Sequence, residues 1–391
     1  SGTGDITGRP TRIPARFSAE ADAVKRAAKL IGDAKRPMII SGQGVYRSGA
    51  QQELIHFAEL IGAKVYGECA SNAWSFPVEH PQFSGDLPRL AVPMRKILEE
   101  ADFLFFVGSE PLVLSFPPEV HPVPEKTPIV HLDLNTWDIG KSFPVDVALY
   151  GDPKMTFPHL IREVEAALGD AGRGRAQERR AKVEKETAAF WEKITPVMKS
   201  GEESKPGMSR TAFQAALGEA LPQGTAFVDE SITTGGNGLR RSIGAKSPDL
   251  FGMKGGGIGM GLPTALGVKA ARPDQPVVCV AGDGSAMYTF QSMWTAARYN
   301  LDAVWIIANN KSYRILKERV LHLNRKSQEF RKFVAMDLEP ELDFIRLAEG
   351  MGVKAVSADS PDDLKSAVKQ ALGSGKPCLI DAAIELEPLE R

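Results

Sequence analysis

The sequence predicts an α/β protein made of two doubly wound domains, each built on a mostly parallel sheet. The first observation is that segments such as 276–281 and 303–308 are apolar almost throughout, as strands covered on both faces are. The second is that segments with helical spacing of apolar residues alternate with such strands. The third is a break in composition at 170–205, where charges of both signs crowd together. We therefore expect two α/β domains separated by a charged helix.

The first predicted domain begins with an amphipathic helix over residues 21–34. A strand and a glycine turn follow at 37–42, and a second amphipathic helix at 51–62. Residues 103–108 and 129–134 are further apolar segments with the length of buried strands. This alternation predicts a Rossmann-like sheet with helices on both faces.

We place the first domain at residues 19–169 and the second at 207–391. Residues 1–18 are short of a domain, and the first fifteen are rich in Gly, Pro and Thr, which is typical of a linker. Residues 170–206 are predicted to form a solvated interdomain helix and linker. A nucleic-acid surface is the alternative for that segment, but its mixed signs and the net charge of −1 disfavour it.

The most informative part of the second domain joins the strands at 276–281 and 303–308. The first strand leads into Gly282-Asp283-Gly284-Ser285 and the second into Asn309-Asn310, with a segment of helical spacing between them. Such a βαβ unit returns both strand ends to one edge of the sheet, where ligands bind in open α/β folds. A helix at 361–372 and a strand at 378–384 are expected to complete the domain.

The residue types at this edge suit a metal ion that holds a phosphorylated ligand. Asp283 offers an anionic oxygen, Asn310 a neutral one, and a backbone carbonyl just beyond Asn310 a third. Mg²⁺ completes such an oxygen set with phosphate oxygens and water. The glycines beside Asp283 allow close backbone approach, and the next helix N-terminus favours an anion. The alternative, a tight turn without a ligand, is the commoner meaning of an isolated Gly-Asp-Gly, but the asparagine pair favours the metal.

These motifs resemble those of thiamine-diphosphate-dependent enzymes, in particular the group of acetolactate synthases, benzoylformate decarboxylase and related 2-oxo-acid decarboxylases. Gly282-Asp283-Gly284-Ser285 followed by Asn309-Asn310 is similar to the family signature. The run 255–263, Gly-Gly-Gly-Ile-Gly-Met-Gly-Leu-Pro, resembles the loop and helix start beneath the thiazolium ring. Asp229-Glu230-Ser231 resembles a segment near the diphosphate. The resemblance covers the family's middle and diphosphate-binding domains.

The resemblance implies roles for individual residues. Asp283, the Asn310 side chain and the Ser312 carbonyl would hold Mg²⁺, while Ser285 and Thr233 would bond to the diphosphate. The other residues expected to contact the cofactor are Glu230, Ser231, Gly282, Gly284 and Tyr313.

The two residues that would serve catalysis lie in the glycine-rich loop. Ile258 would force thiamine diphosphate into its bent conformation, and the Gly256 carbonyl would accept a hydrogen bond from the cofactor's amine. For Ile258, plain core packing is the alternative. Leu316, beyond the metal site, is expected to line the substrate pocket.

The resemblance also implies a domain that this sequence does not match. In the family, an N-terminal domain binds the aminopyrimidine and carries the glutamate that activates the cofactor. We expect another chain or fragment to supply that domain, and we give the activating role to no glutamate here, Glu230 included. Because the family's cofactor bridges two subunits, we expect a homo- or hetero-oligomer, a dimer or a tetramer.

The implied function is Mg²⁺-dependent decarboxylation of a small 2-oxo acid, or its ligation to a second carbonyl compound. Residues 311–319 favour the acetolactate-synthase branch. Residues 80–88 resemble benzoylformate decarboxylase, but the histidine that this enzyme uses is missing after the strand at 103–107, and His121 is the nearest. The alternative of another class is a scaffold or regulatory partner that keeps the fold without the chemistry.

A dinucleotide site in the first domain has weaker support. Gly42-Gln43-Gly44 follows a strand, but the third glycine of the dinucleotide pattern is replaced by Arg47. Acetolactate synthases hold FAD in the equivalent domain, so FAD stays open by resemblance only.

Composition sets wider limits. Hydrophobic residues make up 43% and charged residues 25% of the chain, which is ordinary for a globular protein. No apolar run approaches the roughly 20 residues that span a bilayer, which excludes an integral membrane protein of the helical type. The three cysteines are far apart and are typical of free thiols in a reducing compartment, so we expect a cytoplasmic protein.

Overall fold

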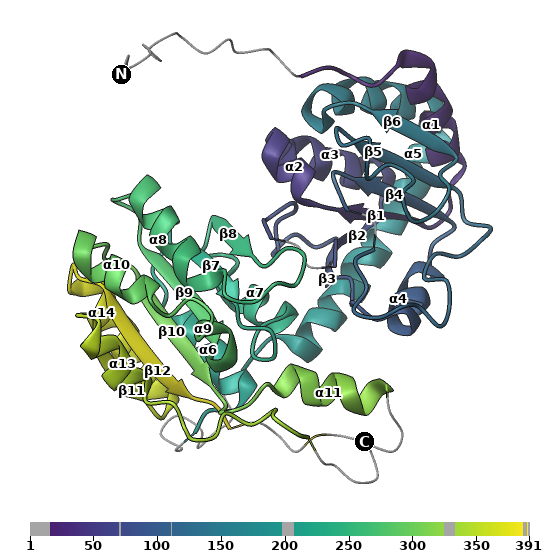
Figure 1. The fold of residues 1–391 in the computed structure, drawn as a ribbon. Helices are drawn as coiled ribbons and strands as arrows, with labels where there is room; N and C mark the ends of the chain where they lie inside the picture. The colour runs from purple at the N-terminus through teal and green to yellow at the C-terminus, as the bar shows by residue number, and fades with distance from the viewer. Residues whose placement is uncertain are drawn as a thin grey trace, which may run out of the picture.

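The protein has two α/β halves, with a long helical segment that leads from one to the other (Figure 1). The computed structural model describes residues 16–69, 72–110, 112–197, 207–323, 333–385 and 389. Most of the predicted linker, the segment 198–206 and part of the C-terminal end lie outside the described residues. Each half carries a six-stranded sheet whose paired strands are all parallel. The predicted α/β class with two doubly wound sheets is confirmed.

The first sheet has the strand order β3-β2-β1-β4-β5-β6. Its strands are β1 Pro37–Ser41, β2 Lys64–Gly67, β3 Phe83–Asp86, β4 Phe103–Val107, β5 Ile129–Asp133 and β6 Val147–Tyr150. The helices around it are α1 Ala21–Asp33, α2 Gln43–Ser48, α3 Gln51–Ile61, α4 Ala91–Leu98 and α5 Pro153–Ile194. Two hydrophobic clusters, one on each face, bury β1, β4 and β5 completely, which is why these strands are mostly apolar. The exceptions are Ser41, His131 and Asp133, which are buried polar residues.

The second sheet has the order β11-β12-β10-β9-β7-β8. Its strands are β7 Ala226–Glu230, β8 Asp249–Gly252, β9 Val277–Gly282, β10 Val304–Asn309, β11 Lys354–Ala358 and β12 Cys378–Ala383. Its helices are α6 Arg210–Ala220, α7 Asn237–Ile243, α8 Gly261–Ala271, α9 Asp283–Ala286, α10 Ser292–Tyr299, α11 Arg314–Leu323, α13 Phe344–Gly350 and α14 Pro361–Gly373. Residues of β9, β10 and β12 alternate between two clusters, so both faces of this sheet are covered as well.

One helical prediction differs from the structure. The segment between β9 and β10 is not one helix: α9 ends at Ala286 and α10 begins at Ser292.

The label α5 covers two helices that meet at a kink. Gly169, with φ 58° and ψ −170°, is non-helical and separates them. The charged helix predicted from residue 170 corresponds to the part of α5 that follows Gly169.

Polar contacts join the two halves. The Asp86 carboxylate at the end of β3 lies 2.9 Å from the Arg240 guanidinium on α7, and both side chains are almost buried. The Trp74 indole donates to the Ser247 carbonyl at 2.8 Å. Helix α11 also reaches from the second half toward the first (Figure 1). None of the described helices combines the length and the apolar character needed to cross a membrane.

Candidate active site

Three central strands of the second sheet end side by side at its carboxyl edge. These strands are β7, β9 and β10, and β9 pairs with both of the others. The chain leaves β7 toward one side of the sheet, to β8, and leaves β9 toward the other side, to β10. This reversal is a topological switch point, where open α/β sheets bind ligands. The predicted metal site therefore lies at the expected edge.

Asp283 is a buried carboxylate held by backbone amides. One oxygen, Oδ1, accepts from the Gly284 amide at 2.7 Å. The other, Oδ2, accepts from the amides of Asn310 at 3.0 Å and Ser312 at 3.2 Å. Burial raises the pKa of Asp283, and these amide donors oppose the rise. The structure thus brings Asp283, Asn310 and Ser312 together, as the sequence predicts.

Asn309 and Asn310, although adjacent, have different hydrogen-bonding states. The Asn309 side chain donates to the Asp381 carboxylate at 3.0 Å and accepts from the Lys311 amide. The side-chain oxygen Oδ1 of Asn310 is buried and has no hydrogen-bond partner among the described residues. An unpaired buried oxygen costs about 1–3 kcal/mol, so a bound group is expected to compensate for it. One carboxylate, one free amide oxygen and nearby backbone fit a hard cation such as Mg²⁺.

The residues that follow Asn310 pack against the turn that carries Asp283. The Ser312 hydroxyl donates to the Met336 carbonyl at 2.9 Å, which fixes the backbone on which the predicted third ligand lies. The Tyr313 ring packs directly on Gly284, where an added Cβ atom would overlap the ring. Gly284 is therefore required for this close approach. Leu316, on the first turn of α11, is 47% exposed and so is available to a ligand.

Three hydroxyl side chains are predicted to contact the diphosphate or the cofactor, and one of them, Ser231, is already hydrogen-bonded within the protein. Ser285 is buried on the first turn after Asp283, and Thr233 is half-buried in the loop after β7. Ser231 is also buried, but its hydroxyl donates to the Asp229 carboxylate at 2.6 Å. Its side chain therefore shapes the loop after β7.

The glycine-rich loop has the backbone of a tight ligand-facing turn. Gly255, Gly256 and Gly259 have φ values of 79°, 84° and 99°, which favour glycine. Ile258, between them, is half-buried and belongs to none of the hydrophobic clusters of the described residues. Plain core packing therefore does not account for Ile258.

Glu230 supports this loop. Its Oε1 accepts from the amides of Gly259 and Met260, and its Oε2 from the Gly261 amide at 2.6 Å. Burial raises the pKa of Glu230. The carboxylate thus anchors the start of α8, a role that sequence reasoning missed because its three bonding partners lie about thirty residues away.

Sequence reasoning also missed two arginines beside the loop. A cavity of about 670 Å³ between the halves is lined by Glu230, Ser231, Arg89 and Arg319, among others. The Arg89 guanidinium lies about 3.5 Å from where a Gly256 Cβ would be. Its Nε is buried without a hydrogen-bond partner among the described residues. No local pattern signals Arg89, because the packing of the two halves creates its position.

The carboxyl edge of the first sheet differs from an open dinucleotide site. The Glu68 carboxylate accepts from the Gln43 amide at 3.0 Å and from the Glu110 amide at 2.7 Å. These amides follow β1 and β4, where dinucleotide phosphates bind in Rossmann folds. Burial raises the pKa of Glu68 to about 7. A side chain of this protein thus occupies the amides that a dinucleotide would need.

Comparison with known proteins identifies both halves. Residues 24–160 match the family model of the thiamine pyrophosphate enzyme central domain. Residues 247–382 match that of the thiamine pyrophosphate enzyme C-terminal TPP binding domain.

Individual relatives agree with the family models. A Methanococcus aeolicus protein named as an acetolactate synthase large subunit is 27% identical over 377 residues, which are 93% of this chain and 60% of that protein. Benzoylformate decarboxylase of Pseudomonas aeruginosa is 27% identical over 90% of this chain and 62% of its own length. A solved thiamin diphosphate-dependent enzyme of Mycobacterium smegmatis superposes with a TM-score of 0.77 at 27% identity, over 97% of this chain and 67% of that one.

The chain spans about 60% of the length of these curated relatives. The matched segments cover most of both sheets, and the matched part of the second half includes β9, β10 and the loops that follow them. The chain therefore belongs to the thiamine pyrophosphate enzymes and contains their central and C-terminal TPP-binding domains.

Proposed function

We propose that this chain binds thiamine diphosphate through Mg²⁺ and is the catalytic large part of an acetolactate-synthase-like enzyme acting on a 2-oxo acid. The observation that carries the proposal is at Asn310, whose backbone amide donates to the Asp283 carboxylate while its buried side-chain Oδ1 has no hydrogen-bond partner among the described residues. A fold kept only as a scaffold has no physical reason to bury such an oxygen without a partner.

In this proposal the metal bridges protein and cofactor. Asp283, the Asn310 Oδ1 and the Ser312 carbonyl would hold Mg²⁺, and diphosphate oxygens would complete its shell. Ser285 and Thr233 would donate hydrogen bonds to the diphosphate. The close packing of Gly284 on Tyr313 supports this, because it holds the two metal-binding turns together.

Thiamine diphosphate, when bound, supplies the electron sink that decarboxylation of a 2-oxo acid requires. Ile258 would press against the bent cofactor, and the Gly256 carbonyl would accept from the cofactor's amine. Glu230 would keep this loop in place through its bonds to the amides of 259–261.

A separate chain or fragment would supply the pyrimidine-binding domain and the activating glutamate. Among the described residues, the Glu230 carboxylate accepts from the backbone amides of 259–261, which supports assigning activation elsewhere. Large exposed side chains on the segment that follows Asp283 support a partner surface: Tyr288 and Trp294, the latter on α10, are each 59% exposed. An oligomer would bury them and complete the site.

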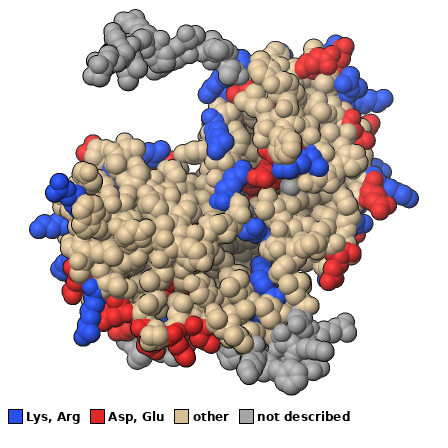
Figure 2. All heavy atoms as spheres, in the orientation of Figure 1, with Lys and Arg blue, Asp and Glu red and all other residues tan. Residues whose placement is uncertain are grey.

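The cavity is lined by three arginines and by three carboxylates, Asp86, Asp229 and Glu230, and of the arginines Arg89 supports an anionic substrate. Arg89 and Arg319 line the cavity beside Gly256, and no acidic side chain among the described residues pairs with Arg89 within 4 Å. Figure 2 shows Lys and Arg side chains gathered along the seam between the halves on this face. A 2-oxo acid carries the carboxylate that such guanidinium groups recognise.

A benzoylformate-type activity on aromatic 2-oxo acids is the second candidate, since benzoylformate decarboxylase is among the relatives. The histidine that benzoylformate decarboxylase uses is missing after the strand at 103–107, which argues against this activity. His121, the nearest in sequence, contacts the Val123 carbonyl at 2.9 Å within its own loop. Sulfoacetaldehyde acetyltransferases are also relatives, so the acceptor belongs to the screen as well.

The test is calorimetric titration of thiamine diphosphate with Mg²⁺ into the chain, alone and with its pyrimidine-binding partner. We expect binding that requires Mg²⁺, tightens with the partner and disappears in Asp283→Ala. The control is Asp274→Ala, which removes an exposed carboxylate of the same half. Equal affinity of Asp283→Ala and the unaltered chain would refute the metal site, and activity toward 2-oxo acids would then have no basis.

A further inference from the structure

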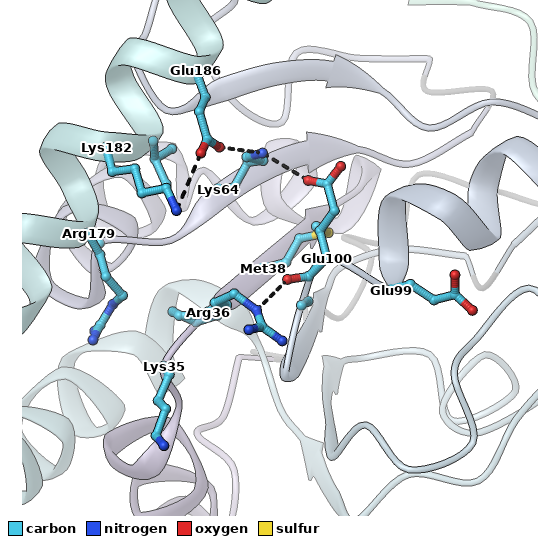
Figure 3. Close-up of a pocket in the computed structure, with 13 residues that line it drawn as sticks. Lys35, Arg36, Met38, Lys64, Glu99, Glu100, Arg179, Lys182 and Glu186 are labelled. Carbon is cyan, nitrogen blue, oxygen red and sulfur yellow. Dashed lines mark hydrogen bonds and ion pairs between the residues drawn. The ribbon is translucent and has the colours of Figure 1, made fainter.

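A second cavity lies at the opposite edge of the first sheet from Glu68. It has a volume of about 530 Å³ and is lined by the amino ends of β1, β2 and β4 and by one side of α5. Its apolar lining includes Met38 on β1, which is labelled in Figure 3, and Val183 on α5. Because all strands of this sheet are parallel, this edge is remote from the carboxyl-edge amides of the same sheet. The cavity is therefore separate from the site described above.

The cavity has more basic than acidic side chains, and its acidic groups are already paired. Lys64 lies 3.0 Å from the Glu100 carboxylate and 2.9 Å from that of Glu186. Glu99, the remaining lining carboxylate, forms its ion pair with Arg95 on α4. Figure 3 shows the Lys64 pairs as dashed lines and Glu99 directed away from Arg36.

Three other cations in the cavity have no such partner. Lys35, Arg36 and Arg179 form no ion pair within 4 Å among the described residues. The Asp102 carboxylate accepts from the backbone amides of Lys35 and Arg36 instead of from their side chains. The guanidinium hydrogen bonds here go to neutral backbone oxygens: Arg36 Nε donates to the Glu100 carbonyl and Arg179 Nη2 to the Ile61 carbonyl, both at 2.8 Å.

Arg179 is the most informative of the three. Its Nε is buried and has no hydrogen-bond partner in the described part of the chain. A buried guanidinium donor without an acceptor is costly, and an anion in the cavity would offset this cost through its attraction to the positive charge of the same guanidinium. The cavity volume also falls in the range of about 300–1,000 Å³ that small-molecule sites occupy.

We propose that this cavity binds an organic phosphate, with its phosphate group between Arg36 and Arg179 and its apolar part against Met38 and Val183. Guanidinium groups bind phosphate through paired hydrogen bonds, and Lys35 adds a third positive charge. The ligand would contact both α5 and the first sheet and so restrain the segment that leads to the second half. The proposal is independent of the reaction at the thiamine diphosphate site.

The test is calorimetric titration of phenyl phosphate and adenosine monophosphate into the full chain, with inorganic phosphate and phenol as comparison ligands. We expect phenyl phosphate to bind more tightly than either comparison ligand, with an affinity that falls as salt is added. Arg36→Gln should weaken binding by about tenfold, the equivalent of one charge-assisted hydrogen bond. Arg179→Gln should do the same.

A charge-matched control distinguishes binding in the cavity from a general effect of the positive charge of the protein. The double variant Arg36→Gln/Arg179→Gln is compared with Lys354→Gln/Lys369→Gln, which removes two exposed charges from the second half. We expect only the first pair to abolish binding, while both retain Mg²⁺-dependent binding of thiamine diphosphate. Equal loss in both pairs, or binding of inorganic phosphate as tight as that of phenyl phosphate, would overturn the proposal. So would retained binding in Arg36→Gln, a change that removes no buried side chain.

Discussion

At the end of β10, two adjacent asparagines have different roles that can be separated by mutation. Asn309 is bonded through both ends of its side-chain amide, whereas the Asn310 Oδ1 has no partner in the described residues. Asn310→Ala should leave the metal-free free energy of unfolding unchanged or slightly higher, because it removes an unsatisfied acceptor. Asn309→Ala should lower it by about 1–3 kcal/mol.

For cofactor binding, we expect Asn310→Ala to have a larger effect than Asn309→Ala, the reverse of their effects on stability. Asn310→Ala should weaken Mg²⁺-dependent binding of thiamine diphosphate at least about tenfold, as expected for a lost metal ligand. Urea unfolding without metal and calorimetric titration with metal measure the two effects. If Asn310→Ala destabilised the metal-free chain as much as Asn309→Ala, its oxygen would be structural.

Glu68 gives a pH prediction at the same scale. Burial raises its pKa from 4.5 to about 7, so the folded state holds the proton more tightly than the unfolded chain. The contribution of Glu68 to stability is therefore greatest below pH 4.5 and falls as pH rises toward 7. Between pH 4 and pH 8, the stability of the unaltered chain should fall relative to Glu68→Gln by roughly 3 kcal/mol. Urea unfolding across this range tests it, and a difference that does not vary with pH would contradict it.

At the scale of elements, the sequence predicts the helices and strands that show a regular local spacing of apolar residues. The helices at 21–34 and 51–62 and the strands at 37–42 and 103–108 follow from the spacing of apolar residues, and the structure confirms them as α1, α3, β1 and β4. Asp283 and Asn310 were found because a βαβ unit places both strand ends together.

The missed features depend on tertiary contacts. The predicted helix after Asp283 breaks before α10, where the Thr289 hydroxyl donates to the Gly259 carbonyl at 2.7 Å and thereby joins the segment to the glycine-rich loop. Glu230 and Arg89 likewise acquire their roles from chain segments that are distant in sequence. Periodicity carries no information about such contacts.

Helix α5 offers a paired test of what its glycines do. Gly169 has φ 58° and ψ −170°, a region open almost only to glycine, while Gly174 is helical, and an added Cβ would meet no atom within 4 Å at either position. Gly169→Ala should therefore lower the free energy of unfolding by about 1–3 kcal/mol through backbone strain alone. Gly174→Ala should raise it by up to about 1 kcal/mol through helix propensity. Urea unfolding of both variants distinguishes strain from packing, and a loss of stability in Gly174→Ala would contradict the assignment.

At the scale of the whole molecule, the ion pair between Asp86 and Arg240 couples the two halves. The side chains are 16% and 10% exposed, and the Asp86 amide also donates to the Asn237 side chain at 2.9 Å. Asp86→Ala leaves the Arg240 guanidinium buried without this carboxylate, which should cost about 3–5 kcal/mol. The loss falls at the contact between the halves, so their thermal transitions should also separate.

Differential scanning calorimetry tests both consequences. The control is Glu99→Ala, which removes a half-exposed carboxylate from the pair with Arg95 and should cost less than about 1 kcal/mol. Because Asp86 and Arg240 also line the cavity beside Ser231, separation of the halves in Asp86→Ala should weaken binding of Mg²⁺ and thiamine diphosphate. A single transition at an unchanged temperature would mean that other contacts, such as Trp74 with the Ser247 carbonyl, suffice to hold the halves together.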